Sequence, residues 1–183
     1  MPSSVEGRER LRLFVALLLP DAAVSSLVEW QQRELGRPTM RVVPPENLHV
    51  TIAFIGGRPT AELETITGAV RTAAGESSKP LLEAVRYRET RSVGMIVLSD
   101  EDRRAGLLAA RVFDELEGLG VYEREHREWL PHVTVARFRE RPRLDPPLPA
   151  LGRVVSSEMA VMISRLRPSG AQYEVVESVP LGG

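Results

Sequence analysis

The sequence contains no cysteine among its 183 residues. Disulfide bonds, thiolate nucleophiles, zinc–cysteine sites and iron–sulfur clusters are therefore excluded as a group. Lysine is almost absent too, because Lys79 is the only one and every other basic residue is arginine. The 24 basic and 25 acidic residues nearly cancel. This balance excludes a strongly basic protein that coats nucleic acid, although it permits a local basic cleft.

Long apolar runs are also missing. Residues 11–19 form an apolar run that is too short to cross a bilayer, and residues 1–10 are polar and charged, unlike a signal peptide. With 43% hydrophobic and 27% charged residues, the chain can still bury a core. We therefore expect a soluble, cytoplasmic protein without a membrane partner. A flexible segment at residues 1–10 would precede one domain at residues 11–183.

Hydrophobic periodicity and turn residues predict the order of helices and strands. Helices are expected at residues 21–35 with Asp21 as the cap, after a capping Thr60, and at residues 99–119, where Ser99-x-x-Asp102 matches a capping box. Strands are expected at residues 11–19, 48–55, 81–87, 92–98, 131–139, 154–166 and 172–179. Residues 141–152 contain four prolines and are expected to be mostly irregular.

One short pattern occurs twice. Residues 49–53 (HVTIA) recur 83 residues later as residues 132–136 (HVTVA). The same offset applied to the first strand and helix predicts a strand near 94–102 and a helix near 104–118, close to what the local patterns indicate. The chain is thus interpreted as a duplication. We expect an α+β, bilobal fold with pseudo-two-fold symmetry, in which two mainly antiparallel sheets with outer helices enclose a central cleft.

Each copy of the pattern places a histidine and a threonine on one face of a strand, because residues i and i+2 point the same way. His49 and Thr51 share a face, and so do His132 and Thr134. Histidine titrates near pH 6.5, so one imidazole can accept a proton from an attacking oxygen while the other protonates a departing oxygen. The threonine hydroxyls can hydrogen-bond phosphate oxygens. The four residues therefore indicate in-line phosphodiester chemistry.

A purely structural role or a metal site is less favoured for these residues. A single His-x-Thr is common in strands, but two matching copies use two of the three histidines in the chain. The third, His126, lies in a charged loop and is not expected to take part. Neither motif histidine has the nearby carboxylate or second histidine that metal sites usually show, and glycine-rich nucleotide motifs are absent. We therefore expect no metal and no cofactor.

Further stretches match a known family. They are residues 12–17 with Pro20, residues 44–56 with Asn47-Leu48-His49, residues 131–137, and Ser164-x-Leu166-x-Pro168-x-Gly170-Ala171-x-Tyr173. In these motifs the chain resembles the 2H phosphoesterase superfamily, and within it the RNA 2′,3′-cyclic phosphodiesterases, also called 2′-5′ RNA ligases. The landmarks cover nearly the whole chain in the order of the family.

The resemblance implies metal-independent hydrolysis of an RNA terminal 2′,3′-cyclic phosphate to a 2′-phosphomonoester. It implies that His49 is the proton donor and His132 the acceptor, and that Thr51 and Thr134 hold the phosphate. Arg137 matches a phosphate-binding arginine of the family. It lies five residues after His132, so an ideal strand would turn it to the opposite face, and a bulge or strong twist is needed. Otherwise Arg137 would be an ordinary surface arginine.

The partners implied are RNA 3′ ends that carry a 2′,3′-cyclic phosphate, possible sources being tRNA halves; no protein partner is implied. Two alternatives stay open. The same site would also serve 2′-5′ ligation of tRNA halves, which is the reverse reaction. An RNA-end-binding protein with residual catalysis is the other, although intact histidines and threonines in both copies argue against it. For Phe14, core packing is favoured over stacking on a base.

Overall fold

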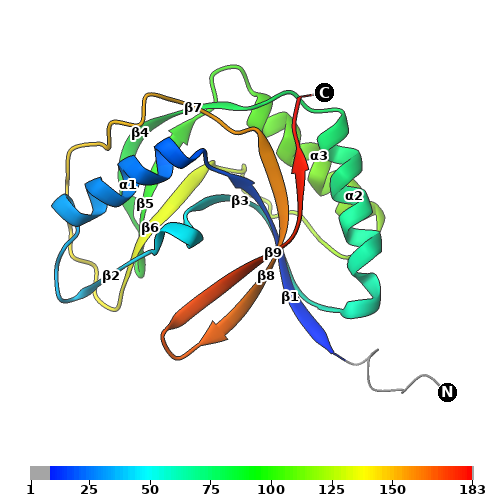
Figure 1. Cartoon of the computed structure of the whole chain (residues 1–183), viewed down its shortest axis with the longest axis horizontal. Helices are drawn as coiled ribbons and strands as arrows, with labels where there is room; N and C mark the ends of the chain where they lie inside the picture. The colour runs from blue at the N-terminus through cyan, green and yellow to red at the C-terminus, as the bar shows by residue number, and fades with distance from the viewer. Residues whose placement is uncertain (1–8, 183) are drawn as a thin grey trace.

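The computed structural model describes residues 9–182, in which nine strands form one curved sheet with antiparallel pairing (Figure 1). The strand order is β7-β4-β5-β6-β3-β1-β8-β9, and β2 pairs with β6. The strands are β1 (Arg10–Leu18), β2 (Met40–Val42), β3 (His49–Pro59), β4 (Leu81–Glu89), β5 (Val93–Ser99), β6 (His132–Phe138), β7 (Arg153–Val155), β8 (Glu158–Arg167) and β9 (Gly170–Pro180).

Three α-helices and two short 3₁₀ turns connect these strands in the described residues. They are α1 (Asp21–Glu34), η1 (Pro45–Asn47), η2 (Thr60–Glu62), α2 (Leu63–Gly75) and α3 (Arg104–Gly118). Figure 1 shows α2 and α3 packed beside each other on one side of the molecule, with α1 on the other side. No helix within residues 9–182 combines the length and the apolar character that a transmembrane span requires.

The predicted duplication is visible in the topology. The order β1-α1-β3 in the first half is repeated as β5-α3-β6 in the second. In each half the motif strand lies at the centre, since β3 pairs with β1 and β6 pairs with β5. The two halves meet where Val50 pairs with Val133, so the two predicted sheets are joined into one. The predicted α+β, duplicated fold is confirmed.

One hydrophobic core runs through both halves. Leu27 of α1, Leu108 of α3 and the joining residues Val50 and Val133 are completely buried within it. Burying an aliphatic side chain of this size contributes about 1.5–3 kcal/mol relative to leaving it exposed. The apolar stripes predicted on the helices therefore hold each helix in place through a shared interior.

Two predicted helix caps are wrong. Helix α1 begins at Asp21, but its side chain makes no capping hydrogen bond; its charge lies in the first turn, where the helix dipole favours an acid. The hydroxyl of Thr60 donates to the carbonyl oxygen of Glu9 at 3.0 Å instead of capping α2, which begins three residues later. The hydrogen bond from Thr60 to Glu9, which is distant in the sequence, forms in place of the local cap.

The capping box predicted at Ser99 is also wrong, and α3 begins at Arg104. The Ser99 hydroxyl donates to the carbonyl of Glu83 on the neighbouring strand. Asp100 caps α3 instead, because its carboxylate accepts hydrogen bonds from the backbone N–H groups of Ala105 (3.1 Å) and Gly106 (2.7 Å), which have no partner within the helix. A turn over residues 100–103, closed by the Arg103 N–H donating to the Asp100 carbonyl at 3.1 Å, brings this carboxylate to the helix end.

The strand predicted at residues 154–166 is two strands, β7 and β8. β7 pairs with β4 in the second half, whereas β8 pairs with β1 and β9 in the first. Ser156, at the break, donates its hydroxyl to the Leu18 carbonyl at 2.6 Å. The polar residues Ser156, Ser157 and Glu158 interrupt the apolar pattern here, but the sequence does not show that the strands on either side have different partners.

The proline-rich segment after β6 is irregular, as predicted. Its anchor is the buried Glu89 carboxylate, which accepts the backbone N–H groups of Arg143 and Leu144, each at 2.9 Å. Burial by itself raises the pKa of Glu89, but the hydrogen bonds from Leu144, Tyr87, Arg141 and Arg143 outweigh it and lower the pKa. At the other end of the chain, most of the predicted flexible segment lies outside the described residues, and Arg10 already belongs to β1.

Candidate functional site

A cleft lies where the two motif strands meet. The antiparallel register that pairs Val50 with Val133 brings the flanking residues of both strands to neighbouring positions on the other face of the sheet. The cleft has a volume of about 140 Å³. Its lining comprises Arg41, Val42, Val43, Pro44, Asn47, His49, Thr51, His132, Thr134, Arg137, Ser169, Gly170, Ala171 and Tyr173. All five predicted site residues therefore line one cleft.

Both motif histidines are anchored in the same way. The Nδ1 atom of His49 is 2.8 Å from the carbonyl oxygen of Asn47, and Nδ1 of His132 is 2.8 Å from that of Leu130. A carbonyl only accepts, so each Nδ1 carries the proton and Nε2 is left for proton transfer. In His49, Nε2 accepts a hydrogen bond from the Thr51 hydroxyl at 2.9 Å.

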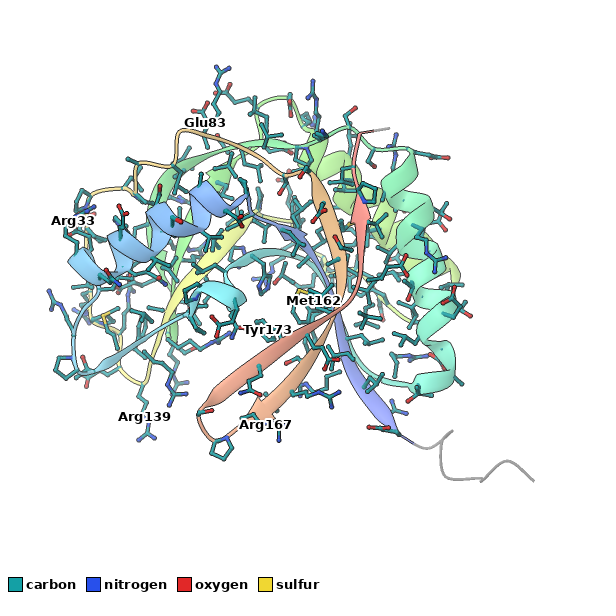
Figure 2. All side chains as sticks on the ribbon, in the orientation of Figure 1. Arg33, Glu83, Arg139, Met162, Arg167 and Tyr173 are labelled. Carbon is teal, nitrogen blue, oxygen red and sulfur yellow. The ribbon has the colours of Figure 1, made fainter. Side chains whose placement is uncertain are left out.

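Aromatic rings enclose His49. Its ring centroid lies 5.1 Å from that of Phe14 and 5.3 Å from that of Tyr173. Tyr173 belongs to β9 of the β8–β9 hairpin and lies near η1 (Figure 2). Phe14 is only 3% exposed, so the packing role favoured for it is confirmed.

Burial is the main cause that lowers the pKa of His49 from 6.5 to about 4. The hydrogen bond to the Asn47 carbonyl opposes this effect, while the nearby His132 and Arg137 lower the pKa further. His49 is therefore neutral at pH 7 in the free protein. A proton donor at this position needs an anion in the cleft, because negative charge favours the imidazolium form.

A bulge in β6 brings Arg137 to the cleft. Thr134 pairs with Met95 and Ala136 with Gly94, so Val135 is an extra residue on this strand. The bulge reverses the alternation of side chains beyond it. Arg137 then shares the face of His132 and lines the cleft, as a phosphate ligand on this strand must.

The first half has the same bulge at the matching place. Thr51 pairs with Ala16 and Ala53 with Val15, which leaves Ile52 as the extra residue of β3. The position that corresponds to Arg137 is Phe54, which is half exposed. The backbone of the two motif strands is thus duplicated in detail, whereas the arginine is present in the second half alone.

The sequence motifs assign no role to several residues that support the site. Asn47 Nδ2 donates to the Ala171 carbonyl at 2.8 Å and so holds the β8–β9 hairpin against η1. The Trp129 indole donates to the Thr51 carbonyl at 3.1 Å and ties the second half to the first motif. Gln31 of α1 donates to the carbonyl of Val135, the bulged residue, at 2.8 Å. These contacts join residues that are distant in the sequence, so no local sequence pattern predicts them.

Arg41 is a second arginine of the cleft that the sequence motifs did not predict. It lies on β2 directly opposite Arg137 on β6. Within residues 9–182, neither guanidinium forms an ion pair with a carboxylate. The cleft therefore presents two uncompensated positive charges to an anionic ligand.

The sequence also predicted that His126 takes no part in the site and that the protein binds no metal. His126 is exposed in the loop before β6 and does not line the cleft. In the part of the chain that the structure describes, no three His, Asp or Glu side chains gather as metal ligands do.

Comparison with known proteins gives sequence relatives of this chain. Residues 17–91 match the sequence model of the family described as LigT like Phosphoesterase. An RNA 2′,3′-cyclic phosphodiesterase from Thermus thermophilus is 29% identical over 187 residues, which cover 94% of this chain and 91% of the relative. Another protein of that name, from Methanocaldococcus jannaschii, is 22% identical over 91% of this chain and 99% of its own.

The fold is similar to that of solved LigT structures. The apo crystal structure of Escherichia coli LigT superposes with a TM-score of 0.79 and 20% sequence identity, covering 96% of this chain and 99% of that one. The resemblance to the RNA 2′,3′-cyclic phosphodiesterases of the 2H phosphoesterase superfamily, drawn from the sequence motifs, is thus confirmed by similar sequences and by a similar fold.

Proposed function

We propose that this protein hydrolyses the 2′,3′-cyclic phosphate at the 3′ end of RNA to a 2′-phosphomonoester, without a metal ion. The observation that carries the proposal is the convergence of two His–Thr pairs and Arg137, from matching strands of the two halves, on one cleft. RNA 2′,3′-cyclic phosphodiesterase is also the name of the Thermus and Methanocaldococcus relatives.

The attacking water needs a base, and His132 fills this role in the proposal. Its Nδ1 is occupied by the Leu130 carbonyl, so Nε2 is the nitrogen that accepts the proton. The water oxygen forms a bond to phosphorus in line with the 3′ oxygen, and the bond from phosphorus to that oxygen breaks. The phosphate stays on the 2′ oxygen. A positioned base of this kind contributes about 10²–10⁴-fold in rate.

The departing 3′ oxygen needs a proton, which His49 supplies from Nε2. Burial keeps His49 neutral in the free protein, with a pKa of about 4. The anionic phosphate, bound beside it, raises that pKa, so the imidazole is protonated and can give its proton to the 3′ oxygen. Thr51, Thr134 and Arg137 hold the non-bridging oxygens, and a charged hydrogen bond of this type is worth about 1.5–3 kcal/mol.

A cavity of about 140 Å³ resembles in size one that holds a benzene ring. It suits the five-membered ring of the cyclic phosphate, while the rest of the terminal nucleotide and of the RNA extends outside. The RNA ends in this proposal include those of cleaved tRNA.

The test is to incubate the protein with an oligoribonucleotide ending in a 2′,3′-cyclic phosphate and to identify the product by mass and by phosphatase sensitivity. We expect a 2′-phosphomonoester. A 3′-phosphomonoester would contradict the assignment of the leaving oxygen. A 2′-5′ linked product on addition of RNA with a 5′ hydroxyl would favour ligation, and binding without turnover would favour an RNA-end-binding protein.

A further inference from the structure

A second cavity continues the cleft toward the β8–β9 hairpin. It has a volume of about 360 Å³ and is more open than the first. Its lining comprises Pro44, Glu46, Asn47, Ser169, Gly170, Ala171, Gln172 and Tyr173, most of which also line the first cavity. The two cavities therefore adjoin, and together they are called the groove: the catalytic residues line the first cavity only, and residues of η1 and the β8–β9 hairpin line both.

Arg41 lies at the junction of the two cavities. It lines the first, and its guanidinium lies beside Gly170, which lines both: a Cβ atom on Gly170 would be 3.3 Å from Nη1 of Arg41. A side chain at position 170 would thus crowd this guanidinium. The backbone of Gly170 adopts a φ of +123°, which also favours glycine.

Besides the histidines, the charged residues that line the groove are Arg41, Arg137 and Glu46, and the two arginines can bind different groups of the ligand. A terminal cyclic phosphate carries one negative charge, and Arg137 lies on the strand of His132 and Thr134, next to where that phosphate binds in the proposed function. Arg41 comes from another strand and stands uncompensated by any carboxylate of residues 9–182. Such a guanidinium can bind a second anionic group of the ligand.

We infer that Arg41 binds the phosphodiester that links the terminal nucleotide of the RNA to the preceding one, and that the second cavity receives this preceding nucleotide. Arg41 is then a specificity-determining residue that selects RNA 3′ ends over single cyclic nucleotides. The inference rests on the proposed function and adds the substrate length to it. A guanidinium suits this task, because its planar fork matches the geometry of phosphate oxygens.

The experiment compares two substrates on the wild type and on Arg41→Ala. The substrates are adenosine 2′,3′-cyclic phosphate, which has no second phosphate, and the dinucleotide ApA with a terminal 2′,3′-cyclic phosphate. We expect Arg41→Ala to raise KM for the dinucleotide about tenfold or more, with kcat little changed, and to lower kcat/KM for the mononucleotide much less. Arg41→Lys keeps the charge without the fork, and we expect it to restore part of the loss.

Salt dependence and a control variant strengthen the comparison. Removal of one phosphate contact from a single strand reduces the slope of log KM against log salt by about 0.7 for the dinucleotide. The matched control is Arg139→Ala, because Arg139 is exposed just beyond β6 and lines neither cavity (Figure 2). Far-UV circular dichroism and the thermal midpoint show whether each variant is folded.

Two results would overturn the inference: equal losses for both substrates, which assign Arg41 to the terminal phosphate, or no loss for either. If the wild type cleaves neither substrate, the proposed function itself fails. Calorimetric binding of the mononucleotide and dinucleotide 2′-phosphates then tests Arg41 separately, and a loss confined to the dinucleotide supports it, whereas any other pattern refutes it.

Discussion

The two catalytic candidates, His49 and His132, have the same anchor but different surroundings. Each donates Nδ1–H to the carbonyl two residues earlier, which leaves Nε2 for chemistry. Only His49 is packed between aromatic rings, those of Phe14 and Tyr173. The duplicated backbone therefore supplies two similar imidazoles, and the side chains around them make the two unequal.

The two histidines should behave as one catalytic unit. Hydrolysis needs a base for water and an acid for the leaving oxygen in the same transition state, so His49→Ala and His132→Ala should each lower kcat by about 10²–10⁴-fold. The double variant should lose much less than the product of the two, because cooperating groups are not additive. Steady-state kinetics on a cyclic-phosphate oligonucleotide measure this. Near wild-type turnover in either folded single variant would refute the paired assignment.

The protonation of His49 should depend on bound phosphate. NMR titration of its ring protons should give a pKa of about 4 in the free protein and a higher pKa when adenosine 2′-monophosphate is bound. An unshifted value in the complex would exclude His49 as the donor and would favour it as the base. Because the folded-state pKa is below 6.5, the stability contributed by neutral His49 is complete above about pH 6.5 and falls as the pH drops toward 4.

At the scale of elements, the bulge of β6 connects the fold to the chemistry. It turns Arg137 into the cleft, and helix α1 supports it through the buried side chain of Gln31. Gln31 Nε2 donates to Val135 O at 2.8 Å and to Val43 O at 3.0 Å. One amide thus joins a helix, the segment after β2 and the bulged strand.

Gln31→Leu should therefore lower both stability and activity. It removes a donor from two carbonyl groups, and leaving a buried polar group with fewer partners costs about 1–3 kcal/mol. Urea unfolding should show this loss, and kcat/KM should fall because Arg137 is no longer held in place. The matched control is Gln32→Leu, since Gln32 is the exposed neighbour on the same helix. Equal stability and activity in the two variants would contradict this role of Gln31.

At the scale of the whole molecule, two halves share one interior. The core cluster contains residues of β1, β3 and α1 together with residues of β5, β6 and α3. The Trp129 indole bonds to the Thr51 carbonyl across the boundary between the halves. The site lies at this boundary, so it exists only when both halves are folded together.

Unfolding should consequently be a single cooperative transition. Far-UV circular dichroism, tryptophan fluorescence from Trp30 and Trp129, and enzyme activity should share one midpoint in urea, as is usual for single domains. Separate midpoints for the spectroscopic probes would show that the halves unfold independently and would contradict a single domain.

Activity should survive an excess of EDTA. Two imidazoles supply both proton transfers of the proposed reaction, and Arg137 with two threonine hydroxyls neutralises and holds the phosphate, so no step requires a divalent ion. Turnover of the cyclic-phosphate substrate before and after chelation measures this. A loss that only an added divalent ion restores would refute the two-histidine mechanism.

The sequence by itself determined the duplication, the order of most elements and the four motif residues. These features depend on local periodicity and on a repeated pattern, and strand geometry alone puts His49 with Thr51 and His132 with Thr134 on shared faces. Counting residues along a strand also showed that Arg137 shares a face with His132 only if a bulge or a strong twist comes between them. Such inferences use neighbours in the chain, which the sequence shows directly.

Only the tertiary structure decided the rest of the site. The bulge at Val135 requires a partner strand and Gln31 of a distant helix, and Arg41 enters the cleft through the pairing of β2 with β6. The lowered pKa of His49 depends on burial against Phe14 and Tyr173. Each of these features arises from residues far apart in the chain, because packing and desolvation are properties of neighbours in space.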